Sequence, residues 1–202
     1  MLNVQYKNIL VYLDEGASNA ERMRTSLSIA RAHNAKITGV ALNTAPSLQA
    51  MLRANIGGAN GLIDKGRAQA EAVIDEFDAL ATTENIDHDT RIIECKEGRV
   101  AQKLAHLARN FDVAVLRQAN PERPNADLVM SVAEEVLFSS GRPVLFIPYI
   151  GAHAIPCKQA LIAWDGSAAS TRAVHDALPL MEQMQEVVVL VVDSDKQEWN
   201  DD

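Results

Sequence analysis

Short runs of apolar residues alternate with amphipathic stretches over residues 1–148, and this alternation constrains the fold most. The runs are continuously apolar, which is typical of strands buried on both faces of a sheet. The stretches between them carry apolar residues at helical spacing. We therefore predict an α/β fold of order β-α-β-α-β-α-β-α-β, with a parallel sheet, right-handed crossovers and helices on both faces. The expected strands are 9–13, 36–42, 90–94, 113–116 and 144–147, and the expected helices are 19–35, 66–81, 100–109 and 127–138.

The helix expected over 19–35 has an apolar side and a basic side. Met23 and Leu27 fall at helical spacing, and Arg22, with Arg24 and Arg31, is available for the other face. The histidines are scattered along the chain, so we expect them at surface or helix-end positions.

The chain repeats its own beginning. Residue 158 corresponds to residue 7, an offset of 151, and the same offset carries Ile37 onto Val188. A register that holds across strand, helix and strand indicates a duplication. The second copy reaches only its second strand, and its last residues, 194–202, are mostly polar and expected to fray. We predict a first domain over 1–148, a linker over 149–157 and an incomplete second domain over 158–202.

Composition argues against several classes of protein. The chain has 27 acidic and 19 basic residues and a net charge of −8, which disfavours binding to nucleic acid. Its apolar runs are too short to cross a bilayer, and a secretory signal is not evident, so we expect no membrane partner. Cys95 and Cys157 are the only two cysteines and form no C-x-x-C motif. This cysteine usage excludes a disulfide framework and favours a cytoplasmic location.

Polar residues follow the first strand and its repeat. These segments are Asp14–Ser18 and Asp165–Ser170, at the strand ends where ligands bind in open α/β sheets. Asp can accept a hydrogen bond from a ribose or base, and Gly lets backbone amides approach a ligand. The same residues are common in turns and helix caps, so both interpretations stay open. If Asp14 is a turn or cap residue, Asp14→Asn should change the free energy of unfolding by about 1 kcal/mol or less. If the same substitution removed a measured hydrolytic activity, that loss would support an enzyme.

Three segments resemble the universal stress protein family: 6–14, 141–148 and 163–167. The resemblance covers the first domain and continues through Asp193. It implies a sheet of order 3-2-1-4-5, a stress-response role in binding or interaction, and a chain similar to the tandem members. It also implies dimerisation through the edge strand Val144–Ile147, because an apolar edge strand leaves backbone groups unpaired. We expect a homodimer or larger species, formed through this strand or through the C-terminal fragment.

Nucleotide-binding members of this family carry G-x2-G-x9-G-[S/T] after the fourth strand, where the glycines admit the phosphates. The resemblance places this motif on Arg117, Asn120, Met130 and Ser131, with the spacing kept and all three glycines replaced. Asn120 is the mildest change, because Asn tolerates left-handed backbone. Arg117 and Met130 should fill the space of a phosphate, and Arg117 is either solvated, ion-paired or able to attract an anion. The positions implied for cofactor binding are Asp14, Leu42, Arg117, Asn120, Ser131, Asp165, Gly166 and Ser167.

Three functions stay open. The first is a stress-response binding protein without catalytic residues or cofactor, the second an adenine-nucleotide (ATP or AMP) binder with slow ATP hydrolysis, and the third a structural dimerisation module. The glycine-rich segment 56–61 follows no strand, so we expect a mobile crossover loop there. Asp87-His88-Asp89 lacks a second His at ligand spacing, so we expect no metal site.

Overall fold

The computed structural model describes residues 5–16, 19–45, 59–96, 98–123, 126–150 and 157–191. The chain divides into two compact units, Tyr6–Ala154 and Met1–Gln5 with Ile155–Asp202, which we describe one at a time. Ser18, the linker core 151–156 and the tail 192–202 lie outside the described residues. The cap predicted at Ser18 and the frayed tail therefore stay predictions.

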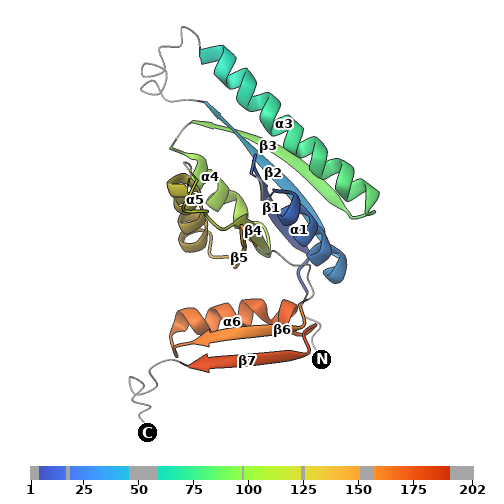
Figure 1. The fold of residues 1–202 in the computed structure, drawn as a ribbon, viewed down its shortest axis with the longest axis vertical. Coiled ribbons are helices and arrows are strands. Elements are labelled where there is room, and N and C mark those ends of the chain that lie inside the picture. Colours follow the sequence, from blue (N-terminus) through green and yellow to red (C-terminus); the bar gives the residue numbers. More distant parts are fainter. Residues whose placement is uncertain are drawn as a thin grey trace. The chain divides into compact units, whose positions relative to one another are not determined.

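The first unit contains a five-stranded parallel sheet of order β3-β2-β1-β4-β5 (Figure 1). This arrangement confirms the predicted fold class and strand order. None of the described helices combines the length and the apolar composition that a membrane span needs. The strands are β1 (Asn8–Leu13), β2 (Lys36–Ala45), β3 (His88–Lys96), β4 (Val113–Arg117) and β5 (Val144–Ile147), and the helices are α1 (Asn19–His33), α3 (Ala59–Thr83), α4 (Val100–Ala108) and α5 (Ala126–Ser139).

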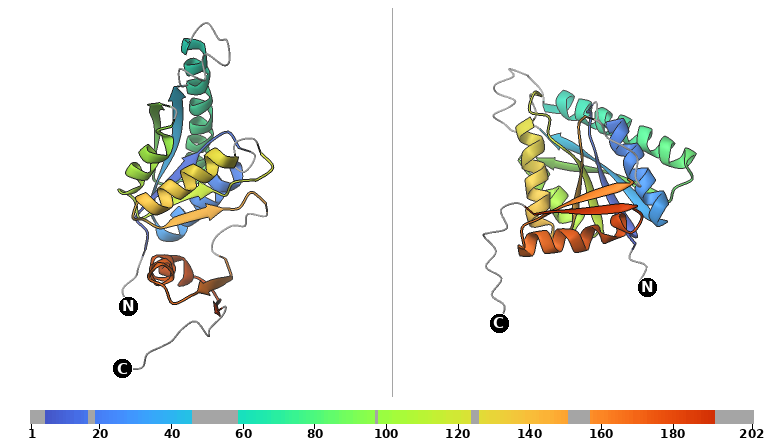
Figure 2. Two further views of the ribbon diagram at one scale, coloured as in Figure 1. Left: turned by 90° about the vertical axis from the view of Figure 1, so that its left-hand side faces the viewer. Right: turned by 60° about the horizontal axis from the view of Figure 1, so that its bottom comes forward.

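The helices form a layer on each face of this sheet, with α1 and α3 on one face and α4 and α5 on the other (Figures 1 and 2). Right-handed crossovers require this division. The chain moves across the sheet in one direction from β1 to β3, then crosses to the other side of β1 and moves in the opposite direction from β4 to β5. Ile9, Leu10 and Val11 of the central strand are fully buried as a result. On one face, Leu10 shares a core cluster with Leu104 of α4 and Val136 of α5.

Gly39 in β2 allows α3 to pack closely on the other face. A Cβ atom at Gly39 would lie 2.6 Å from Cδ1 of Phe77 and 3.0 Å from Cδ1 of Leu13. Because real Cβ contacts are longer than this, only glycine leaves room for the buried Phe77 ring.

The helix α3 begins at Ala59 rather than at residue 66. The loop predicted over 56–61 is therefore wrong for Ala59–Gly61, which are helical, while 56–58 lie outside the described residues. Gly61 and Gly66 lower the helix propensity of these turns, which explains why the sequence pattern missed them.

The second unit consists of β6 (Gln159–Trp164), α6 (Ala168–Met181) and β7 (Glu186–Val191), with β6 and β7 parallel. The strand β6 follows β1 at the offset of 151, but the next strand does not keep that offset. Asn8 pairs with Lys36 in the first unit, whereas Gln159 pairs with Glu186. The connection between the paired residues is one residue shorter in the second unit, so the offset of 151 does not carry the pairing register of the first unit onto the second. That the second unit copies the first stays a prediction.

The apolar residues of the second unit are largely exposed. Leu161 is 65% exposed, whereas Leu10, its counterpart in β1, is fully buried. Val187–Val191 of β7 are 42–56% exposed, and Pro179 is the only buried residue within 157–191. Both strands thus have the continuous apolar sequence of interior strands without the cover that such strands need.

Candidate functional site

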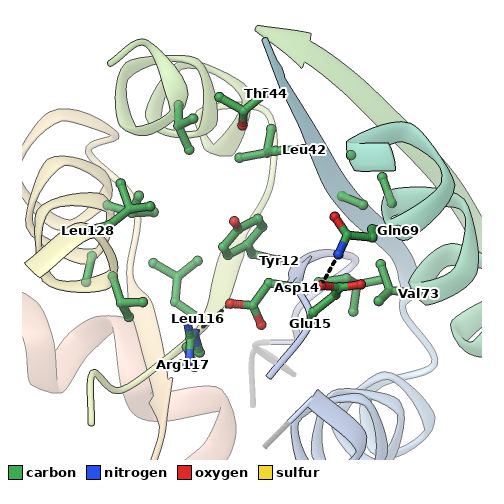
Figure 3. Close-up of a pocket in the computed structure, with 18 of the residues that line it drawn as sticks. Tyr12, Asp14, Glu15, Leu42, Thr44, Gln69, Val73, Leu116, Arg117 and Leu128 are labelled. Atoms are coloured by element: carbon green, nitrogen blue, oxygen red, sulfur yellow. Dashed lines mark hydrogen bonds and ion pairs between the residues drawn. The ribbon is translucent and has the colours of Figure 1, made fainter. Parts of the chain in front are cut away.

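A cavity of about 580 Å³ opens at the carboxyl ends of the central strands of the first unit (Figure 3). Tyr12 of β1 lies in the middle of the labelled residues. Leu42 and Thr44 of β2, Gln69 of α3 and Leu128 of α5 surround it. The strands are parallel, so their carboxyl ends meet at this one edge, where open α/β sheets bind ligands.

The wall of this cavity is mainly apolar, and its central polar group is the Tyr12 hydroxyl. Burial raises the pKa of Tyr12 to about 12, and the negative charge of Asp14 adds to the increase. The hydroxyl therefore stays protonated at neutral pH and can donate a hydrogen bond. The apolar side chains of the wall are Leu13, Ala41, Leu42, Ala70, Val73, Val100, Leu116, Leu128, Val129, Val132 and Ala133.

Asp14 joins two arginines in a buried cluster, which we call the Asp14 triad (Asp14, Arg22 and Arg117). Asp14 Oδ1 lies 2.6 Å from Nη2 of Arg22, and Oδ2 lies 2.6 Å from Nε of Arg117. The side chains of Arg22, Arg117 and Asp14 are 0%, 10% and 17% exposed. Of the alternatives for Arg117, the structure thus has the ion pair. The expectation that Arg22 lies on the face of α1 opposite the apolar one is wrong, because its guanidinium is buried in an ion pair with Asp14.

The triad contains more positive than negative charge. Arg22 and Arg117 share the single carboxylate of Asp14, and Arg22 also donates to Oδ1 of Asn19 at 2.7 Å. Nε and Nη1 of Arg22 are buried without a hydrogen-bond partner in the described part of the chain. Burial accordingly lowers the pKa of Arg22 from its ordinary value.

Gly16 supports the triad by leaving space beside it. A Cβ atom at Gly16 would lie 3.3 Å from Nη1 of Arg117, closer than most such contacts. The absence of a side chain at this position therefore makes room for the Arg117 guanidinium. Each oxygen of Asp14 is paired with a guanidinium, so a ligand that donates to Asp14 would share this carboxylate with two arginines.

The other positions aligned with the glycine motif do not reach the cavity wall. Asn120 lies outside that wall, and its Oδ1 accepts a hydrogen bond from the Glu122 amide at 3.0 Å within its own turn. Its φ is not positive, so the left-handed backbone that Asn tolerates is not used here. Ser131 is exposed, and Met130 is 51% exposed. Met130 does not line the cavity, and the expectation that its side chain fills the space of a phosphate stays a prediction.

Asp165, Gly166 and Ser167 form a turn and a helix cap in the second unit. Asp165 Oδ1 accepts from the Ser167 amide at 3.0 Å, and Ser167 Oγ accepts from the Ser170 amide at 3.1 Å at the start of α6. Gly166 has a φ of 72°, which glycine adopts readily. Hydrogen bonds from Ser167 and Ser170 lower the pKa of Asp165 to about 2. The segment therefore forms a turn and a helix cap, and ligand binding by these residues stays a prediction.

The structure brings Asp14, Leu42 and Arg117 together, and it adds Tyr12 and Gln69, which sequence reasoning did not single out. Tyr12 lies inside an apolar strand, and Gln69 is one of many polar residues of the amphipathic helix α3. Neither position therefore differs from its neighbours in a way that would indicate a binding residue. Among the described residues, no three His, Cys, Asp or Glu side chains gather as metal ligands would.

No protein-family model and no curated protein matches the chain. Solved structures do match. A universal stress protein family member from Burkholderia pseudomallei has a TM-score of 0.55 at 25% identity, covering 71% of this chain and 96% of that chain. A universal stress protein from Archaeoglobus fulgidus DSM 4304 has a TM-score of 0.71 at 16% identity, covering 95% of this chain and 68% of that chain. A universal stress protein in complex with cAMP has a TM-score of 0.53 at 22% identity, covering 71% of this chain and 98% of that chain.

The sheet of order β3-β2-β1-β4-β5, its two helix layers and the cavity at its carboxyl edge define the first unit as a doubly wound α/β domain. The chain has the fold of the universal stress protein family.

Proposed function

We propose that the first unit is a stress-response binding protein of the universal stress protein type. In this proposal its cavity holds an uncharged ligand, and the unit neither binds nucleoside triphosphates nor catalyses a reaction. The observation that carries the proposal is the Asp14 triad, because it pairs Arg117, the cation at the first position aligned with the glycine motif, with a carboxylate and so makes it less able to attract a phosphate. The apolar wall and the protonated Tyr12 hydroxyl favour an uncharged ligand with a hydrogen-bond acceptor.

Three features of the site also disfavour a triphosphate, although Lys65 adds a positive charge to the cavity wall. The family's glycine cradle is replaced by larger side chains, and Arg117 is already paired with Asp14. Glu15 lies on the cavity wall, where it accepts a hydrogen bond from Gln69 at 2.7 Å (Figure 3). A carboxylate at this position would repel a phosphate chain.

The alternative is an adenine-nucleotide binder, of ATP or AMP, with slow ATP hydrolysis. It is favoured by the position of the cavity at the carboxyl edge and by the structural neighbour described in complex with cAMP. In this alternative Arg117 would contact a phosphate through its Nη atoms, or through its whole guanidinium after leaving the Asp14 carboxylate to Arg22.

Calorimetry with adenosine, AMP and ATP, each with magnesium, separates the two functions because the three probes differ only in phosphate charge. We expect any affinity to fall from adenosine to AMP, and ATP to give no saturable heat even at millimolar concentration. Ala70→Trp, which fills the cavity, should abolish an adenosine signal. Micromolar binding of ATP would establish the alternative and refute the proposal.

We also propose that the second unit is a partial copy of the first and that the chain associates with itself. The parallel pairing of β6 with β7 and the 95% coverage in one solved chain support the copy. The outer edge of β5 is unpaired in the described sheet, and β7 is exposed along its length. Unpaired strand edges and exposed apolar strands both favour association.

A further inference from the structure

A second hollow, of about 880 Å³, lies at the carboxyl end of β3 beside α4, and we call it the β3–α4 groove. The helix α4 starts close to the point where β3 ends (Figure 1). The volume of the groove is within the range of small-molecule sites. Among the described residues, its lining is Asn43, Ile63, Ile93, Glu94, Cys95, Lys96, Arg99, Gln102, Lys103, His106, Leu107 and Asn110.

Part of the β3–α4 groove is apolar. Ile93 of β3 and Leu107 of α4 are half-buried, and Cys95 is buried. Ile63 of α3 adds a further aliphatic side chain. A hydrocarbon body of a ligand would therefore cover surface that is now partly exposed to water.

Cationic residues border this apolar surface. Arg99, Lys103 and His106 recur at helical spacing at the start of α4 and along it, and Lys96 ends β3. Lys103 is held at the groove by donating to the Glu94 carbonyl at 2.8 Å. This hydrogen bond uses a carbonyl oxygen and leaves the charge of Lys103 uncompensated.

These cations have few acidic neighbours. Lys96, Arg99 and Lys103 form no ion pair with an acidic residue of the described chain, and Glu97 lies outside it. Glu94, the acidic residue in the lining, is 3.4 Å from Arg67. In a chain of net charge −8, such a cluster would attract an anion.

We propose that the β3–α4 groove binds an amphipathic monocarboxylate, with its hydrocarbon chain on Ile93 and Leu107 and its carboxylate at Arg99 and Lys103. A carboxylate accepts charge-assisted hydrogen bonds from both cations, and the chain covers the apolar surface. This site shares no lining residue with the cavity around Tyr12, so it does not depend on the function proposed for that cavity.

Calorimetry and amide chemical-shift mapping with decanoate, below its micelle-forming concentration, test the proposal on the full chain. Decan-1-ol has the same chain without the charge, and acetate has the charge without the chain. We expect saturable binding of decanoate, about tenfold tighter than either control molecule, with the largest shifts in residues 93–107. Equal affinity for decanol or acetate would overturn the proposal, as would shifts centred on another part of the chain.

Variants locate the site. Arg99→Glu combined with Lys103→Glu should weaken decanoate binding about tenfold or more, because both side chains are exposed and their loss leaves the core intact. Arg24→Glu reverses one charge on exposed α1 surface outside the groove and should change the affinity less than twofold. Val189→Asn removes an exposed apolar residue of β7 and should also have no effect. A loss of binding in either control variant, or no loss in the double variant, would refute the assignment.

Discussion

The Asp14 triad makes Asp14 a determinant of stability, contrary to the expectation from sequence that Asp14→Asn costs little. Among the described residues, Asp14 is the acidic residue that pairs with Arg22 and Arg117, and the substitution removes its charge from between side chains that are 0% and 10% exposed. The neutral amide can accept from one guanidinium but cannot compensate two buried cations. Removing one partner of a buried ion pair costs about 3–5 kcal/mol, and we expect a loss in this range.

The measurement is urea unfolding, followed by circular dichroism, for the wild-type chain and three variants. In a thermal melt, a loss of this size would lower the Tm of a unit of this length by about 10 °C. Glu15→Gln changes the next carboxylate to an amide at an exposed position and should cost less than about 0.5 kcal/mol. Arg22→Met keeps the aliphatic packing and leaves a complete Asp14–Arg117 pair, so it should cost less than Asp14→Asn.

The order of these costs tests the reasoning, because it depends on the excess positive charge of the triad. If Asp14→Asn and Glu15→Gln had similar small effects, the triad would not be a buried ion cluster in solution. If Arg22→Met were the more destabilising of the two triad substitutions, hydrogen bonding by Arg22 would outweigh the charge balance.

Three further predictions concern packing, pH and association. Gly39→Ala should destabilise the first unit by about 1–3 kcal/mol through its clash with Phe77, and Phe77→Leu should recover part of this loss in a double-mutant cycle of urea unfolding. Burial, aided by the nearby Lys7 charge, lowers the pKa of His33, so the unfolding free energy should fall as the pH drops through about 6.5. His33→Phe should flatten that pH dependence, and an unchanged slope would contradict it. Light scattering at tens of micromolar should show a dimer or larger species, weakened by Phe146→Lys if β5 pairs at its edge; a 22.0 kDa monomer would refute association.

Strands β1, β4 and β5 could be predicted to within a residue or two because each is an apolar run between polar segments, whereas β3 mixes polar and apolar residues and only its middle was predicted. Burial on both faces produces this pattern directly, so the pattern identifies both the strand and its place inside a parallel sheet. The start of α3 could not be predicted, because its first turns contain glycine and little amphipathic periodicity.

The candidate site was less predictable for a different reason. Arg22 has the sequence context of a surface residue on an amphipathic helix, and only the three-dimensional position of Asp14 makes its burial understandable. His33 was expected at the surface or a helix end; it ends α1 but is 1% exposed, because its ring lies 5.1 Å from that of Tyr6. Such contacts join residues that no local spacing rule connects.

The exposed strand β7 has a consequence for handling and folding of the chain. Val187–Val191 are five consecutive β-branched or aliphatic residues without proline, glycine or charge, the composition of segments that stack into cross-β fibrils. Glu186 and Asp193 flank the segment as charged residues, which is how natural sequences restrain such stretches. Because β7 is exposed along its length, we expect this segment to favour aggregation and to limit the solubility of the chain.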